Sequence, residues 1–280
     1  MTSIEPQIEL INVGRQKLRT AVWKGTGRKR PILFFNGIGA NLELVAPLGE
    51  MMADRSDVVV FDMPGIGGSP AATMPYRPST VVKWSNKLLD ELGYDDVDVM
   101  GISWGGGAAQ QFALDNPDRA RCLVLLATSA GMAMVPGNFS ALSKMGNPRR
   151  YVDTDYMMKN FETLYGDNAD KSALGHKSRI MPPSKRGYLY QLMAMAGWTS
   201  IHRLPFLKQP TLVMSGDRDH IVPLANARIL KAAIPRADIN IVKGGGHLFA
   251  VSRVHQVVPI ISRYLDDHAD DYAGAAAYST

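Results

Sequence analysis

The residues with the clearest chemical potential form the sequence Gly-Ile-Ser-Trp-Gly at positions 101–105. A short apolar run precedes it at 97–100, and a segment of helical character follows. Gly-x-Ser-x-Gly between a strand and a helix is typical of a nucleophile elbow, a tight turn that lifts the serine hydroxyl out of a sheet. The flanking glycines fit this turn, because a Cβ at Gly101 or Gly105 would collide with neighbouring backbone. The pattern predicts that Ser103 is an activated nucleophile.

A serine hydroxyl needs a histidine to accept its proton and a carboxylate to hold that histidine. Behind an elbow of this kind the partners follow in the order serine, acid, histidine. His247 follows an apolar run and a glycine-rich loop, which leaves its ring room to reach the elbow. The other five histidines suit the role less well, because they lie beside the acid, in helical or tail sequence, or in an insertion: His220, His255, His268, His176 and His202. We therefore expect His247 to be the base.

Two aspartates, Asp217 and Asp219, compete for the role of the acid. Both follow the apolar run 211–214, and His247 follows a second run at 239–242. The carboxyl ends of parallel strands meet at one edge of a sheet, so the acid and the base are expected there together. Asp217 could instead cap a turn, as aspartate after glycine often does. The residues alone leave this choice open.

The anion that forms on a carbonyl oxygen during acyl transfer needs hydrogen-bond donors already in place. One predicted donor is the main-chain N–H of Trp104, directly after the nucleophile. The other is the N–H of Ile38, in the glycine-containing loop 36–41, although that loop could be no more than a tight turn.

No cofactor or metal site is predicted. The glycine-rich loops 62–69 and 244–246 lack the spacing of a dinucleotide fingerprint or a Walker loop, and 62–69 is interpreted as a turn after a strand. No cluster of histidines and cysteines has the spacing of a metal site.

The elements that must position these residues alternate between strand-like and helix-like segments. Continuous apolar runs are typical of strands buried on both faces of a parallel sheet. They occur at 31–35, 58–61, 97–100, 122–127, 211–214 and 239–242, after an expected antiparallel pair at 8–13 and 18–23. Helical patterns occur at 79–92, 224–234 and 251–265, the last with Pro259 expected to kink or split it. The fold class predicted is α/β, with a mostly parallel central sheet and helices on both faces.

The alternation stops between residues 131 and 205, where helix-like sequence contains no convincing strand. We expect a core of residues 1–130 and 206–268 with a helical lid at 131–205, which is also the suspected substrate-binding region. Eight of the 15 methionines fall in this segment, so they could accept a flexible aliphatic substrate or simply pack the lid. The sequence from Asp266 onward, and residues 269–280 in particular, is expected to be frayed or disordered.

Composition narrows the class of protein. The chain has 280 residues, of which 46% are hydrophobic and 20% charged, and its net charge is +5. The basic cluster at 24–30 has no interleaved aromatic residues, so it is interpreted as a solvated turn and no nucleic-acid partner is expected. The single cysteine, Cys122, is expected in the core. With no secretory signal and no membrane span in view, these features favour the cytoplasm.

With these residues in place, the chain resembles the α/β-hydrolase superfamily and, within it, the intracellular depolymerases of medium-chain-length poly(3-hydroxyalkanoate). Asn36-Gly37, where many relatives carry His-Gly, points to this branch. The most specific matching strings occupy 35–44, 102–106, 134–137, 148–151, 197–202 and 246–249. The resemblance implies a catalytic triad of Ser103, Asp219 and His247, and so selects Asp219 over Asp217. It also implies a polyester or ester substrate and contact with the surface of polymer granules.

Departures from the family pattern leave other substrates open. Gly107 and Ala108 stand where bulkier residues are expected, and Arg218 and His220 surround the acid. The same machinery could serve a small-molecule carboxylesterase, a carbon–carbon bond hydrolase or a proline iminopeptidase. The last should carry more acidic residues in its lid than this chain has. A non-catalytic scaffold on the same fold is the remaining alternative, and the oligomeric state is not indicated by the sequence.

Overall fold

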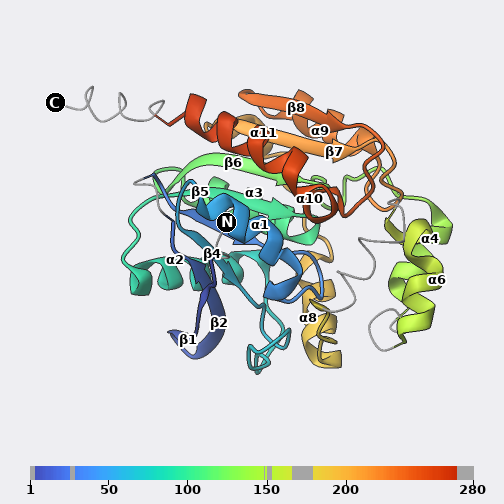
Figure 1. Ribbon diagram of the computed structural model, residues 1–280, viewed down its shortest axis with the longest axis horizontal. Helices are drawn as coiled ribbons and strands as arrows, with labels where there is room; N and C mark the ends of the chain where they lie inside the picture. The colour runs from blue at the N-terminus through green and yellow to red at the C-terminus, as the bar shows by residue number, and fades with distance from the viewer. Residues whose placement is uncertain (1–3, 26–28, 148, 150–152, 166–178, 270–280) are drawn as a thin grey trace.

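The computed structural model describes residues 4–25, 29–147, 149, 153–165 and 179–269. At its centre lies an eight-stranded sheet in the order β1-β2-β4-β3-β5-β6-β7-β8 (Figure 1). The strands are β1 (Gln7–Val13), β2 (Gln16–Trp23), β3 (Ile32–Phe35), β4 (Val58–Phe61), β5 (Val97–Ile102), β6 (Ala120–Leu126), β7 (Thr211–Gly216) and β8 (Ala237–Val242). β2 pairs antiparallel with β1 and β4, and all the other pairs are parallel. The predicted α/β class is confirmed.

The central strands are almost completely buried, which is why their sequences are mostly apolar. β4, with the sequence Val-Val-Val-Phe, is an example. β5 runs two residues beyond its predicted end, because Gly101 and Ile102 still pair with Leu125 and Leu126 of β6. The nucleophile elbow therefore follows directly from the last paired residue of a central strand.

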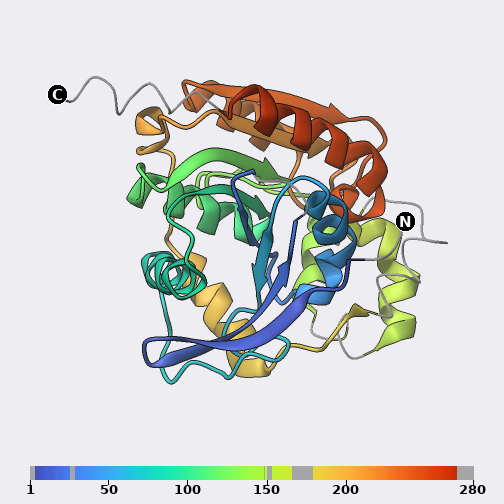
Figure 2. The same ribbon diagram turned by 60° about the vertical axis from the view of Figure 1, so that its left-hand side comes forward.

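Helices cover both faces of the sheet, as expected (Figure 2). One face packs against α2 (Pro78–Leu92), α3 (Trp104–Asp115) and α9 (Leu224–Ala233). The other packs against α1 (Ala46–Ala53), which the sequence patterns did not predict, and against α10 (Phe249–Ser252) and α11 (Val254–Asp267). α2 ends where predicted, at Gly93, whose φ of 74° is a left-handed conformation that favours glycine.

Pro259 is expected to kink or split the C-terminal helix, and the prediction of a split there is wrong. The break lies at Arg253, between α10 and α11, and Pro259 lies inside α11. Proline removes the hydrogen bond to the carbonyl of His255, and both residues lie on the exposed side of α11, where water can replace that bond. The apolar side of the helix, which includes Val257 and Ile261, stays packed on the core.

The expectation of frayed structure from Asp266 onward is also corrected. Asp266 belongs to α11, and its carboxylate lies 2.6 Å from the ammonium of Lys29 and 2.9 Å from the guanidinium of Arg55. The basic cluster 24–30 is thus partly paired with acids rather than simply solvated.

Cys122 is fully buried, as predicted. Residues 270–280 of the expected tail lie outside the described part of the chain.

The insertion, residues 131–205, connects β6 to β7. Its described part contains α4 (Phe139–Gly146), α6 (Thr154–Tyr165), α8 (Lys185–Met195) and the short 3-10 helix η2 (Leu204–Phe206), and no strand. These helices lie beside the carboxyl ends of the central strands (Figure 1). A Cβ on Gly107 would lie 2.9 Å from Met195 and 3.0 Å from Trp198. The small residue that departs from the family pattern thus makes room for the insertion.

Across the residues described, no helix combines the length and the apolar character that crossing a bilayer requires.

Candidate active site

The turn between β5 and α3 holds Ser103 in a strained conformation. Its φ of 54° and ψ of −120° are unusual for a residue with a side chain, and such strain is characteristic of functional turns. A Cβ on Gly101 would lie 2.3 Å from the carbonyl oxygen of Gly105, and one on Gly105 would lie 2.1 Å from that of Phe35. The predicted reason for both glycines is confirmed.

Hydrogen bonds from the end of β6 support this turn. The amide of Ser103 donates to the carbonyl of Leu126 at 2.9 Å, and the hydroxyl of Thr128 donates to the carbonyl of Ser103 at 2.7 Å. Ala127, between these two supports, has a φ of 46°. Sequence reasoning missed Thr128, since a lone threonine after a strand carries no distinctive pattern.

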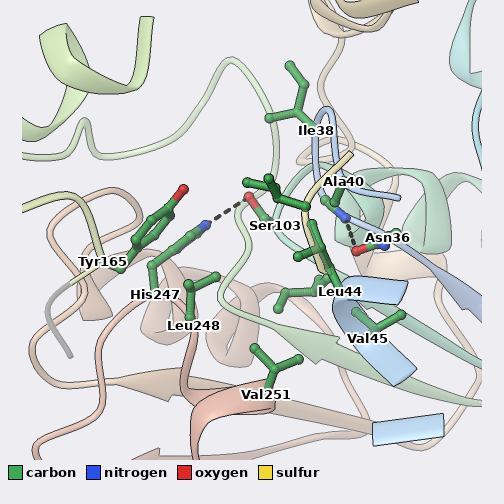
Figure 3. Close-up of a pocket in the computed structure, with 13 residues that line it drawn as sticks. Asn36, Ile38, Ala40, Leu44, Val45, Ser103, Tyr165, His247, Leu248 and Val251 are labelled. Atoms are coloured by element: carbon green, nitrogen blue, oxygen red, sulfur yellow. Dashed lines mark hydrogen bonds between the residues drawn. The ribbon is translucent and has the colours of Figure 1, made fainter. Parts of the chain in front are cut away.

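The structure brings Ser103, His247 and Asp219 into contact. Nε2 of His247 lies 3.0 Å from Oγ of Ser103 (Figure 3). Nδ1 of the same ring lies 2.8 Å from Oδ2 of Asp219. The carboxylate can only accept, so Nδ1 carries the ring proton and Nε2 offers a lone pair to the serine hydroxyl. His247 and Asp219 are 4% and 5% exposed, which keeps competing water from both contacts.

The two candidate aspartates have different surroundings. The second oxygen of Asp219 accepts the amides of Ile221 and Val222 at 2.9 and 2.8 Å, which fixes the carboxylate toward the ring. Asp217 points elsewhere: its carboxylate accepts the amide of Gly244 at 2.6 Å in an exposed turn. Asp217 therefore stabilises a turn, which was the other role considered for it. Asp219 is the aspartate that contacts His247.

The loops that carry the acid and the base lie against each other. A Cβ on Gly216 would lie 2.1 Å from the carbonyl oxygen of Gly245, so glycine is required for this approach. Of the other described histidines, His255 is exposed on α11 and His268 hydrogen-bonds the carbonyl of Tyr264. His220 and His202 are also exposed, and His176 lies outside the described residues.

The loop that carries Ile38 lies across from the elbow (Figure 3). The amide of Ala40 donates to the carbonyl of Gly37 at 3.2 Å, which closes a turn around Ile38 and Gly39. A Cβ on Gly37 would lie 3.8 Å from the Cβ of Ser103, so the loop runs close to the nucleophile. Trp104 is the first residue of α3, and N–H groups in a first helical turn lack partners within the helix. The two segments that carry the predicted oxyanion donors therefore lie next to Ser103.

A pocket opens beside Ser103 and His247, and its lining is largely apolar. Side chains of the core supply most of the wall, and the insertion contributes Tyr165 and Ile180. The apolar members are Ile38, Ala40, Leu44, Val45, Ile102, Ile180, Leu248 and Val251 (Figure 3). No methionine is among the described lining residues, and Met132 and Met193 are 68% and 48% exposed. None of the described methionines therefore lines this pocket.

The glycine-rich loop 62–69 is a turn region after β4, as predicted. Asp62 is buried and accepts the amides of Leu42 and Gly68 at 2.7 and 2.9 Å, and Arg19 lies 3.1 Å away. Burial raises the pKa of this carboxyl, and these hydrogen bonds and the guanidinium oppose the rise. The contacts of this loop are therefore structural. The described residues contain no group of three potential metal ligands.

Comparisons with known proteins bear on the fold and the family of the chain. A family model described as "alpha/beta hydrolase fold" matches residues 30–253. The chain is 45% identical over 258 residues to a poly(3-hydroxyalkanoate) depolymerase of Ectopseudomonas oleovorans, with 91% of each chain covered. It is 28% identical to a 2-hydroxymuconate semialdehyde hydrolase of Pseudomonas putida, over 74% of this chain and 76% of that one. The solved 2-hydroxy-6-oxo-6-phenylhexa-2,4-dienoate hydrolase of Rhodococcus sp. strain RHA1 superposes with a TM-score of 0.79 at 18% identity, covering 94% of this chain and all of that one.

Proposed function

We propose that this chain, which belongs to the α/β-hydrolase family and within it to the poly(3-hydroxyalkanoate) depolymerases, cleaves ester bonds of medium-chain-length poly(3-hydroxyalkanoate) or its oligomers. Its family makes it a hydrolase that acts on esters. The observation that carries the proposal is the contact of Ser103, His247 and Asp219 beside an apolar pocket that Ser103 and His247 line.

The reaction begins when Oγ of Ser103 attacks the ester carbonyl carbon while Nε2 of His247 takes the hydroxyl proton. Asp219 holds the ring and stabilises the imidazolium. The tetrahedral intermediate collapses, the ester C–O bond breaks, and His247 gives the proton to the leaving hydroxyl oxygen. Water then attacks the acyl-serine by the same route, which releases the hydroxy acid and restores Ser103.

The amides of Ile38 and Trp104 are assigned to the oxyanion that forms in both half-reactions. They come from two different segments, one after β3 and one at the start of α3. The N-terminus of a helix also carries partial positive charge, which favours an anion at that point. Donors fixed in advance stabilise the transition state without reorganisation during the reaction.

The choice of substrate rests on the pocket and on the depolymerase relative. A medium-length aliphatic side chain is apolar, and the lining residues Leu44, Val45 and Val251 offer it a matching surface. The insertion supplies Tyr165 and Ile180 to the same pocket, so we assign it the role of a lid over the site. We place the protein in the cytoplasm, at or near the surface of the polymer it degrades.

Two of the alternatives need charged groups that the described lining of the pocket does not contain. A proline iminopeptidase must bind a free amine, and a hydrolase of ring-cleavage products must bind a carboxylate. Among the described lining residues there is no Asp, Glu, Lys or Arg. Asp153 of the insertion is paired with Arg149 at 2.6 Å and is not among them. A small-molecule carboxylesterase needs no such charge, and it remains the competitor to test.

The test is clearing of a poly(3-hydroxyoctanoate) suspension by the purified chain. The same preparation is assayed on poly(3-hydroxybutyrate), on p-nitrophenyl octanoate and on a proline amide, with Ser103→Ala as the inactive control. The proposal expects clearing of the first suspension and hydrolysis of the octanoate, both lost in the variant. Hydrolysis of the soluble ester without any clearing would make the chain a small-molecule esterase instead.

A further inference from the structure

We propose that Gln191, on helix α8 of the insertion, is a positioning residue that sets the geometry of the oxyanion hole. The inference rests on the proposed function, since it takes the Ile38 and Trp104 amides as the oxyanion donors. Gln191 is fully buried and lies outside the pocket lining, so it acts through other residues rather than on the substrate.

The first link runs from the Gln191 side chain to the loop of Ile38. Oε1 of Gln191 accepts the amide of Gly39 at 2.8 Å, a contact between positions 152 residues apart in the chain. Gly39 has a φ of 67°, the positive value that the third position of a type II turn requires. Its N–H belongs to the central peptide of that turn, so this bond fixes the peptide plane next to Ile38. The direction of the preceding Ile38 amide depends on the same turn.

The second link runs from the Gln191 main chain to the elbow. Nε1 of Trp104 donates to the carbonyl of Gln191 at 2.9 Å. The indole of Trp104 is thereby attached to α8, and its main-chain amide is the other assigned oxyanion donor. One residue of the insertion therefore touches both segments that make up the hole.

The polarity of Gln191 argues for a positioning role rather than for stability. Only the amide oxygen can accept the Gly39 N–H, so the orientation of the side chain is fixed. Nε2 is then left buried and, among the described residues, without a hydrogen-bond partner. A buried donor without a partner destabilises the fold, and an apolar side chain of the same length would avoid that loss. The side chain therefore binds the Gly39 amide while its own Nε2 stays without a hydrogen bond among the described residues.

A second contact, at Asn41, also connects this loop to the insertion. The side chain of Asn41, also fully buried, donates to the carbonyl of Arg179 at 2.8 Å and accepts the amide of Met181 at 3.0 Å. Ile180, between these two residues, lines the pocket. The insertion therefore holds this loop at Gly39, inside the turn, and at Asn41, directly after it, and Gln191 is the anchor nearer to the assigned donor.

The test is Gln191→Met, which keeps the length of the side chain and removes the acceptor. We expect kcat on p-nitrophenyl octanoate to fall about 10- to 100-fold with KM within a factor of about three, because a misplaced donor weakens only transition-state binding. The affinity for an alkyl boronic acid, which forms a tetrahedral anion on serine, should fall by a similar factor. The matched control is Gln209→Met: Gln209 is also buried, but it bonds the carbonyls of Ala113 and Pro117 at the far end of α3. It should lose stability only.

A kcat for Gln191→Met within twofold of wild type, or a loss carried entirely by KM, would overturn the proposal. A loss of the same size in Gln209→Met would also overturn it. If Gln191→Met does not fold, Trp104→Phe breaks the second link and keeps the main-chain amide. It should lower kcat and boronate affinity together, and an unchanged kcat would count against the idea. All of these assays use a soluble ester, so failure to degrade polymer would be seen separately.

Discussion

The main-chain amide of His247 donates a hydrogen bond to the carbonyl of Tyr165, the last residue of α6, at 2.5 Å. The loop that carries the acid has a similar link, since the amide of Asn138 donates to the carbonyl of His220 at 2.8 Å. Together with Gln191, these bonds connect the insertion to the loops of the base, the acid and the oxyanion. The insertion is therefore part of the framework that positions the chemistry.

Ser103→Ala should abolish hydrolysis of p-nitrophenyl octanoate, with kcat lower by about 10⁴-fold or more, because no other hydroxyl occupies the elbow. Folding should be preserved, since the hydroxyl contributes one hydrogen bond. Initial rates and far-ultraviolet circular dichroism measure the two effects. Ser143→Ala, on the exposed side of α4, should behave as wild type. Full activity in the Ser103 variant would end the proposed mechanism.

The two aspartates offer a direct comparison. Asp219→Asn should lower kcat/KM by about 10⁴-fold, because an amide in that place no longer holds the productive tautomer of His247. Asp217→Asn should change it by no more than a few-fold, since Asp217 contacts only an exposed turn. Steady-state kinetics of both variants on one ester distinguish them. A large loss in Asp217→Asn with little loss in Asp219→Asn would reverse the assignment.

Gly105→Ala should destabilise the fold by at least about 3 kcal/mol, or roughly 10 °C in Tm, because its Cβ would meet the Phe35 carbonyl, which is rigid backbone. The matched control is Gly197→Ala: Gly197 has a φ of 76°, but no atom lies within 4 Å of the place that its Cβ would take. That variant should lose only about 1 kcal/mol. Thermal unfolding of both proteins measures the difference, and equal losses would contradict the steric argument.

Val251→Phe should shift the enzyme toward shorter acyl chains. Val251 lines the pocket from α10, and a phenyl ring there would take the space assigned to the acyl group. We expect kcat/KM to fall about tenfold or more for p-nitrophenyl octanoate and less than threefold for the butyrate, since each lost buried CH₂ is worth about 0.8 kcal/mol. The exposed Val135→Phe serves as control. Parallel losses on both esters would place the acyl chain elsewhere.

Asp266 gives a prediction about pH. Burial opposes ionisation of this carboxyl, but hydrogen bonds from Lys29 and Arg55 outweigh it and hold the pKa below its ordinary value. A lowered folded-state pKa means that the charge stabilises the fold above the unfolded-state pKa of about 3.9 and that this stability is lost as the pH falls through the folded-state pKa.

The side chain of Asp266 is 40% exposed, so Asp266→Asn should cost no more than about 1 kcal/mol at pH 7. The difference from wild type in the free energy of unfolding by urea should shrink as the pH is lowered from 7 to 3. Asp267→Asn, the exposed neighbour, is the control. A difference that stays constant over this range would rule out the ion pairs as its source.

The features that sequence reasoning predicted correctly depend on local patterns. Continuous apolar runs gave the buried strands, and two glycines around a serine gave the elbow, because each constraint acts within a few residues. The predicted end of β5 was too early because Gly101 and Ile102 continue a pairing that only the neighbouring strand reveals. The outcome at Pro259 was not predictable for a similar reason. The cost of a proline in a helix depends on whether the carbonyl four residues earlier, here that of His255, faces water.

The supports of the site were not predictable in this way. Gln191 and Thr128 act through hydrogen bonds to segments 152 and 25 positions away, and their own surroundings carry no distinctive pattern. The choice of Asp219 over Asp217 came from a family resemblance. The physical difference between them, two amide donors from Ile221 and Val222, appears only in the folded loop.

Gly107 bears on how such enzymes can be re-engineered. Its missing Cβ leaves space on α3 for Met195 and Trp198, so this position of α3 is matched to the side chains of this insertion. Transplanting the insertion of a relative to change substrate range would therefore leave a gap or a clash at this helix. A working chimera therefore has to exchange Gly107 and its neighbours on α3 together with the transplanted insertion.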